Sequence, residues 1–259
     1  MTDVTALPRT RTAALVGAVC TALAVGVVGC AEEDPDAGTN GVGKLSPQKI
    51  EHRALTAAGR AGSVRLSGSV VTQGRTYKLD MRLKRGEQGG GIGQVSTKGK
   101  TFEMLRVGND LYLKADADFW ASQEGGGQPS KSDEAAASKL GDKYVKVPPG
   151  DPAYKQLSGF TDMELLMDGL LELRGGLETG ERGTVAGYRT VRITVGDGDG
   201  DGDGGALDVS LKGTPYPLRL QRAGGAGVLE LTDWNRDFTL KAPNKDHIVD
   251  YGKQITTGN

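Results

Sequence analysis

The amino-acid sequence predicts an α+β domain in which one large antiparallel sheet carries helices on an apolar face. The first observation is that apolar and polar residues alternate over two stretches, residues 64–114 and 177–233. Alternation with a period of two is typical of strands that have one buried face and one solvated face. The second observation is the segment 162–174, where apolar residues recur at helical spacing. An apolar sheet face needs a cover, and an amphipathic helix supplies one.

The N-terminal segment has the three parts of a secretory signal. Arg9 and Arg11 give it a positive start, residues 12–28 form an apolar run, and the small residue Gly29 stands before Cys30. The tetrapeptide that ends at this cysteine, VVGC, resembles the lipobox of bacterial lipoproteins. That resemblance implies cleavage before the cysteine and a thioether-linked diacylglyceryl group on it, with acyl chains such as palmitate.

The alternative for the same segment is an uncleaved membrane-spanning helix, because an apolar run of this length is near the lower limit for crossing a bilayer. The residues that follow, 31–34, are mostly acidic, whereas a stop-transfer flank is rich in Lys and Arg. Cys20 is a poor competitor as lipidation site, since Val19 stands directly before it. The sequence therefore favours a signal peptide over residues 1–29 and a protein anchored through Cys30 to the extracytoplasmic face of the cell membrane.

Composition argues against several classes of function. The chain has a formal net charge of −1, so it lacks the clustered basic face that nucleic acid requires. The only cysteines are Cys20 and Cys30, both outside the predicted domain, so we expect no disulfide and no thiol chemistry in it. The only histidines are His52 and His247, and we interpret both as surface residues. Histidine is the commonest side chain in metal sites and in acid–base catalysis, so its scarcity argues against most sites of either kind.

Residues 30–46 are rich in acidic residues, Pro and Gly, and predict a lipidated cysteine followed by a flexible tether. Ser46 and Pro47 are typical of a helix start, and they open a helix predicted over 47–59. Strands follow, then a helical insert, then further strands, whereas the tail from residue 241 has no clear period. The predicted strands are 64–70, 77–84, 92–98, 101–107, 110–114, 143–147, 177–185, 188–195, 207–212, 216–222 and 227–233, and the insert adds helices over 131–140 and 162–174.

Several local runs carry a resemblance when they are taken together and in order behind a lipobox. They are DLYLK at 110–114, Phe119-Trp120, KYVKVP at 143–148, PYPLRL at 215–220 and LTDW at 231–234. The chain resembles actinobacterial lipoproteins of the LolA-like class, including the LprG/LppX group. The resemblance covers roughly residues 47–245.

That resemblance implies a half-barrel over residues 47–259, which is a single strongly curved antiparallel sheet of about ten or eleven strands with helices across its concave face. It also implies an apolar cavity between the layers, in which such proteins bind or carry lipids, or a sensor domain on the same fold. The Gly-Asp repeat at 196–205 departs from the family.

The candidate cavity combines apolar positions from the early strands with the apolar stripe of the helix at 162–174. Methionine adapts to variable acyl chains, which favours a binding surface. The alternative is that these side chains form an ordinary core, which is the commoner role of such a stripe. The candidate ligand-binding residues are Leu66, Leu79, Met81, Met163, Leu166, Met167 and Leu170.

The run of alternating Asp and Gly offers a weak candidate for calcium. Asp197, Asp199, Asp201 and Asp208 match ligand positions of an EF-hand loop, with Asp at the last position in place of the usual Glu. Helices are expected on neither side of it, so a low-complexity hairpin loop is the favoured interpretation.

The sequence contains no recognisable catalytic constellation. No G-x-S-x-G motif is present, and neither histidine has a carboxylate at motif spacing. We therefore expect a non-enzymatic lipoprotein without a cofactor, which holds a lipid or another amphiphile in its cavity. The alternative is a protein-interaction or sensor module with a filled core on the same fold, whose protein partner is unknown.

Overall fold

The computed structural model describes residues 36–72, 74–121, 131–171, 173–196 and 205–250. Contacts divide the chain into two units, Met1–Pro35 and Asp36–Asn259, and everything described below belongs to the second. The predicted signal segment and Cys30 lie outside the described residues.

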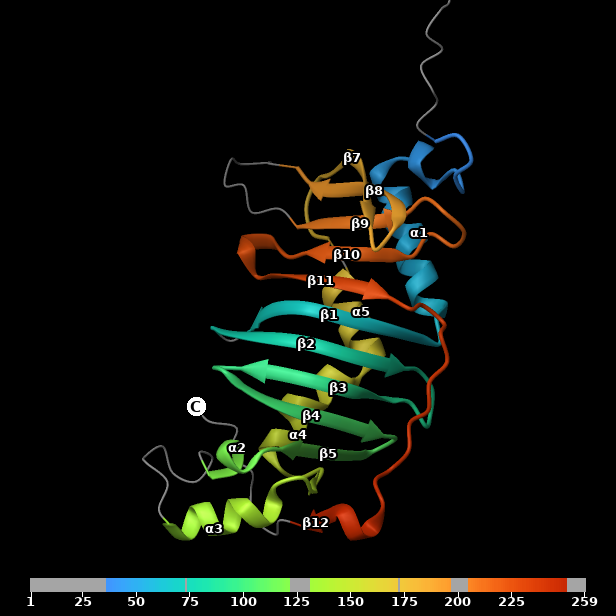
Figure 1. Ribbon diagram of the computed structural model, residues 1–259. Helices are drawn as coiled ribbons and strands as arrows, with labels where there is room; N and C mark the ends of the chain where they lie inside the picture. Colours follow the sequence, from blue (N-terminus) through green and yellow to red (C-terminus); the bar gives the residue numbers. More distant parts are fainter. Residues whose placement is uncertain (1–35, 73, 122–130, 172, 197–204, 251–259) are drawn as a thin grey trace, which may run out of the picture. The chain divides into compact units, whose positions relative to one another are not determined.

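One open, curved sheet of twelve strands forms the framework (Figure 1). The early strands β1 to β6 make one half and the later strands β7 to β11 make the other, and the halves meet where β1 pairs with β11. Every pairing is antiparallel except that of β12 with β6. The strands are β1 (Ser63–Thr72), β2 (Arg75–Lys84), β3 (Gly90–Thr97), β4 (Lys100–Val107), β5 (Asp110–Ala115), β6 (Tyr144–Val147), β7 (Leu177–Val185), β8 (Tyr188–Val195), β9 (Ala206–Ser210), β10 (Pro217–Gln221), β11 (Gly227–Thr232) and β12 (Ile248–Asp250).

The strand count of twelve corrects the expected ten or eleven. The additional strand is β12, which comes from the tail that has no clear period in the sequence. Three residues are too few to display alternation, and the parallel pairing with β6 depends on a partner about a hundred residues earlier in the chain. The predicted α+β class and largely antiparallel sheet are confirmed.

The register brings residues of like character into rows across the sheet. One row on the apolar face runs through Leu231, Leu66, Met81, Gly93, Met104, Leu113 and Val145, and every side chain in it is almost completely buried, with the partly exposed Gly93 in the middle. The next row along the strands, on the other face, is polar: Arg192, Asp208, Arg219, Glu230, Ser67, Asp80, Gln94, Glu103, Lys114 and Tyr144. The predicted division into one apolar and one polar face therefore extends across both halves of the sheet.

Opposite charges lie beside each other in the polar row. Arg192 and Asp208 are 2.8 Å apart, and Arg219 lies 3.0 Å from Glu230. At the far end of the row, the hydroxyl of Tyr144 is hydrogen-bonded to the Glu103 carboxylate. Burial, together with this carboxylate, raises the pKa of Tyr144 to about 12.

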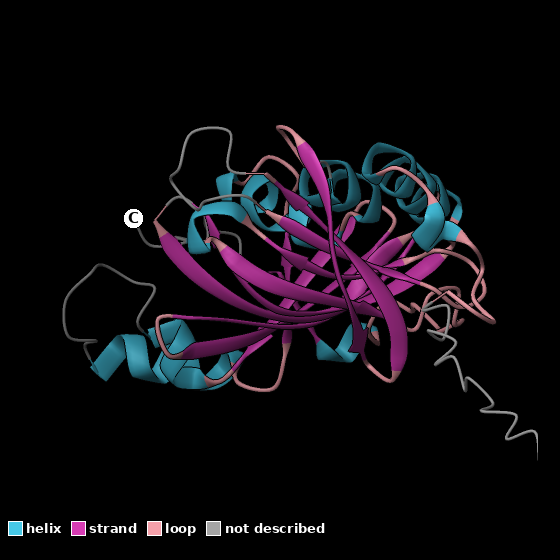
Figure 2. Cartoon of the chain, turned by 90° about the horizontal axis from the view of Figure 1, so that it is seen from above, coloured by secondary structure: helices cyan, strands magenta, loops and turns pink. Residues whose placement is uncertain are grey.

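Helices pack along the sheet, as Figure 2 shows for its upper side. The α-helices are α1 (Pro47–Arg60), α2 (Ala117–Ala121), α3 (Lys131–Leu140), α4 (Pro152–Ser158) and α5 (Met163–Leu171), and the short 3₁₀ turns are η1 (Val42–Lys44), η2 (Gly159–Thr161), η3 (Ala223–Gly225) and η4 (Lys245–His247). The predicted helices correspond to α1, α3 and α5. The short helices α2 and α4 were not predicted, although Asp151 and Pro152 form a start signal for α4, in which Asp151 accepts a hydrogen bond from the Ala153 amide.

Residues 36–46, the described part of the tether predicted over 30–46, pack against the sheet instead of forming a flexible segment. Asp36 is buried, and both of its carboxylate oxygens accept hydrogen bonds from Arg182 in β7. The Asn40 side chain donates to the carbonyl oxygens of Ser210 and Gly213, and Val42 is also buried. The composition of this segment is polar, which predicted a tether. The contacts that hold it join residues far apart in the sequence, so they cannot be inferred from local composition.

Gly93 provides a test of the apolar row. It lies between Met81 and Met104, and an added Cβ would lie 2.1 Å from the carbonyl oxygen of Asp80 and 2.8 Å from the Met81 sulfur. We expect Gly93→Ala to lower the free energy of unfolding by about 1–3 kcal/mol in urea denaturation. As control, Gly59→Ala in α1 meets no atom within 4 Å and is expected to stabilise by about 0.5–1 kcal/mol. If the urea midpoint of Gly93→Ala equals that of the unaltered protein, the close packing around Gly93 is contradicted.

Candidate functional site

A cleft of about 570 Å³ lies between the apolar face of the sheet and the helices α4 and α5, which cross behind the sheet in Figure 1. Strands β1, β2 and β11 form its floor, and α4, η2 and α5 form its roof. Its floor is lined by Val70, Thr72, Tyr77, Leu79 and Leu229, its roof by Pro152, Lys155, Gln156, Gly159, Phe160, Leu165, Leu166 and Leu170, and Arg222 at the end of β10 completes the lining.

The floor of the cleft is shaped by a glycine. Gly68 pairs with Leu229 on one side and with Leu79 on the other, so it occupies the centre of the row that forms the floor. Its φ of +135° disfavours any other residue, and an added Cβ would lie 2.2 Å from the carbonyl oxygen of Val228. A glycine at this position lets β1 and β11 approach closely beside the two leucines.

The roof helix α5 is held to the sheet at its start. Asp162 caps α5, because its Oδ1 accepts hydrogen bonds from the Glu164 and Leu165 amides. Arg106 of β4 donates to Thr161 Oγ1 at 2.9 Å, to the Thr161 carbonyl oxygen at 3.0 Å and to Asp162 Oδ2 at 3.2 Å. One guanidinium therefore fixes both the turn before α5 and its capping residue.

Two further contacts hold the roof in place. Beyond the end of α5, the Leu173 amide donates to the Glu51 carboxylate of α1 at 3.0 Å. Between α4 and α5, the Phe160 ring packs against Tyr77 of the floor, with ring centroids 5.2 Å apart. The roof is therefore tied to the sheet and to α1 at several points, and the cleft is part of the folded structure.

The structure separates the predicted ligand-binding residues into two groups. Leu79, Leu166 and Leu170 line the cleft. The others are buried in the hydrophobic core around it and do not line it: Leu66, Met81, Met163 and Met167.

Sequence reasoning missed part of the lining. Tyr77 and Leu229 lie in strands whose alternation was recognised, so their direction could have been read from it. Phe160, Lys155 and Gln156 lie in η2 and α4, which are too short to give a periodic signal.

Most of the calcium candidate lies outside the described residues, namely Asp197, Asp199 and Asp201. Asp208 is described: it lies in β9, and its two oxygens accept hydrogen bonds from Arg192 Nε at 3.0 Å and Nη2 at 2.8 Å. This pairing raises the pKa of Arg192, chiefly through the hydrogen bonds. Within the described ranges, no three His, Cys, Asp or Glu side chains gather closely enough to hold a metal ion. His52 and His247 are exposed, as expected.

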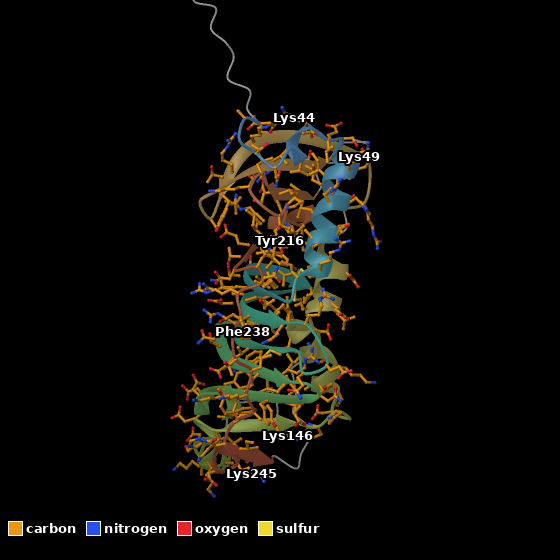
Figure 3. All side chains as sticks on the ribbon, turned by 90° about the vertical axis from the view of Figure 1, so that its right-hand side faces the viewer. Lys44, Lys49, Lys146, Tyr216, Phe238 and Lys245 are labelled. Carbon is orange, nitrogen blue, oxygen red and sulfur yellow. The ribbon has the colours of Figure 1, made fainter. Side chains whose placement is uncertain are left out.

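A second cleft, of about 540 Å³, lies on another part of the surface near the β7–β8 turn and the ends of β9 to β11. Tyr216, labelled in Figure 3, stacks on Trp234 with ring centroids 4.8 Å apart, and the Trp234 Nε1–H donates to the carbonyl oxygen of Pro217. Its lining combines these two rings, Ala186, Tyr188 and Leu218 with polar side chains: Ser210, Lys212, Thr214, Thr232, Asp233 and Arg236. The cleft beneath α4 and α5 is the one that lies between the sheet and the helices packed on its apolar face.

Truncation of α5 residues will separate core from cleft. Met163 is 2% exposed and lies in the core, so we expect Met163→Ala to lower the free energy of unfolding by about 2–5 kcal/mol. Leu166 borders the open cleft and has fewer contacts to lose, so we expect Leu166→Ala to lower the free energy of unfolding by clearly less than Met163→Ala does. Urea denaturation of both variants measures the difference. Equal losses would show that the two side chains are equally packed.

The described fold is similar to that of LprF from Mycobacterium bovis, with a TM-score of 0.53 and 17% sequence identity over 77% of this chain and 99% of that one. LppX from Mycobacterium tuberculosis aligns with a TM-score of 0.43 and 14% identity over 74% of this chain and 96% of that one, a score too low to support an argument. No family model matches the sequence, and a search of curated proteins gives no match. At these identities the likeness to LprF concerns the fold alone, and it supports the LolA-like fold that the sequence motifs predicted.

Proposed function

We propose that this protein is a membrane-anchored, extracytoplasmic lipoprotein that binds or carries a lipid or another amphiphile without covalent chemistry. The observation that carries the proposal is the cleft of about 570 Å³ between the sheet and α4–α5, because sites for small ligands typically measure about 300–1,000 Å³ and are mainly apolar. The apolar part of the ligand would lie on Leu79, Leu229 and the leucines of α5.

The driving force would be removal of apolar surface from water on both partners. Each methylene of an acyl chain that leaves water contributes about 0.8 kcal/mol. Leu165 is 66% exposed at the cleft, so it leaves apolar surface at the site for a ligand to cover.

Anchoring through Cys30 would keep the cleft close to the membrane. Asp36 is already held to β7 by Arg182, and six residues of fully extended chain, the number from Cys30 to Asp36, span at most about 22 Å. A flexible tether over residues 30–46 would let the domain lie farther from the membrane than this. Such a short link suits a protein that exchanges an amphiphile with the bilayer surface. Among the described residues, no helix has the length and apolar character needed to cross a membrane.

The second candidate function is a protein-interaction or sensor module on the same fold. That function requires no open space inside the domain, whereas carriage of an amphiphile does. The volume of the cleft supports the carrier, and the exposed Tyr188 beside the second cleft supports an interaction surface. The two functions differ in whether the purified protein holds a ligand.

Native mass spectrometry tests the binding function. We expect the protein, purified from a bacterial host without detergent, to carry a bound amphiphile in part of its molecules. Leu170→Trp should lower the bound fraction several-fold, because the larger side chain fills the cleft. Val228→Trp adds an indole at an exposed position outside the lining and should leave the bound fraction unchanged. Ligand-free protein from several hosts would count against the proposal.

Anchoring has a separate test. Cys30→Ser should abolish incorporation of labelled palmitate and move the protein from the membrane fraction to the soluble fraction, because one serine cannot carry the thioether-linked group. Cys20→Ser is the matched control and should change neither result. Membrane retention of the Cys30→Ser protein would indicate an uncleaved apolar span.

A further inference from the structure

The charged side chains that line the cleft are all cationic. They are Lys155 on α4, in the roof, and Arg222 at the end of β10, at the floor. Among the described lining residues there is no carboxylate, and the other members are apolar or uncharged. Because one cation lies on each wall, the described lining residues carry a net positive charge beside an apolar interior.

Both cations have hydrogen-bonding capacity left for a ligand. Lys155 is exposed and has no hydrogen bond or ion pair with any described residue. Arg222 is half-buried, and the one hydrogen bond of its side chain within the described residues is a long one, from Nη1 to the Val71 carbonyl oxygen at 3.4 Å. Elsewhere on this domain arginines are mostly paired with carboxylates, as Arg192 is with Asp208.

We propose, resting on the function above, that the ligand is a single-chain amphiphile with an anionic head group, a carboxylate or a phosphate. Its chain lies in the cleft, and its head group meets Lys155 and Arg222. The volume of about 570 Å³ is in the middle of the range for one small ligand, which favours one chain over several.

The chemistry of the two cations fits such a head group. The guanidinium offers several N–H donors in a fixed plane that matches carboxylate and phosphate oxygens, while the lysine ammonium acts as a mobile point charge. An exposed lysine leaves the head group in contact with water, so the ligand's charge does not have to be buried. A neutral head group would gain neither charge-assisted hydrogen bonds nor Coulomb attraction.

Isothermal titration of the full-length protein tests the proposal with four probes of equal chain length. They are palmitate, palmitoyl lysophosphatidate, the neutral monopalmitoylglycerol, and the two-chain dipalmitoyl phosphatidate. We expect both anionic single-chain probes to bind at least tenfold more tightly than the neutral one, and more tightly than the two-chain probe. The stronger of the two anionic probes identifies the head group.

Variants then assign the preference to the two residues. Lys155→Gln with Arg222→Gln should reduce the preference for anionic probes about tenfold or more, and leave binding of the neutral probe unchanged. The matched control removes two exposed cations from α1, Lys49 (Figure 3) and Arg53, each by substitution with Gln, and should keep the preference. Lys155→Gln alone should lower the preference for anionic over neutral probes several-fold. Because Lys155 is exposed, this single variant is the test to use if the double variant melts at a lower temperature.

Each contrary outcome has a distinct meaning. Equal binding of neutral and anionic single-chain probes would overturn the inference and leave the proposed function standing. An anionic preference that survives the double variant would overturn the assignment to Lys155 and Arg222. Tighter binding of the two-chain probe would overturn the single-chain part. If none of the four probes binds, both the inference and the proposed function fail.

Discussion

An open sheet with a continuous apolar face must be covered, and this constraint governs the rest of the domain. Twelve strands at about 4.8 Å spacing make a layer roughly 50 Å wide, whereas the nine residues of α5 extend only about 13 Å. No single helix can cover such a surface. The cover is assembled from short helices that run in different directions, and the cleft lies where α4, η2 and α5 meet. The candidate site is thus a consequence of how the apolar face is closed.

The position of the cover depends on a few polar contacts. Arg106 fixes the start of α5, Glu51 holds the chain after its end, and Asp162 supplies its cap. Each contact is modest in energy, yet each satisfies a backbone group that would otherwise be left without a partner at a helix end. Together they attach both ends of α5 to the sheet and to α1, beside the cleft.

The polar face has a different role from the apolar one. The Arg219–Glu230 pair is partly exposed on both sides and adds little to the free energy of unfolding, whereas the carboxylate of the Arg192–Asp208 pair is buried. Their alternation in sign across neighbouring strands still matters for register, since a slip by one residue would turn the apolar side chains of a strand to water and set its charged residues opposite apolar ones. The clasp between Asp36 and Arg182 adds a further restraint, because it joins the start of the domain to the edge strand β7.

The sequence by itself determined the class of the fold, most of the strands, and the helices α1, α3 and α5, because alternation and helical spacing are local signals that survive without tertiary contacts. It also placed Leu79, Leu166 and Leu170, which line the cleft, on the apolar faces of their strand and helix, because periodicity gives the direction of each face. Only the tertiary structure decided which apolar residues border open space and which fill the core, because volume depends on how far two layers stand apart. It alone brought Lys155 and Arg222 to one cleft, since they lie in elements distant in sequence.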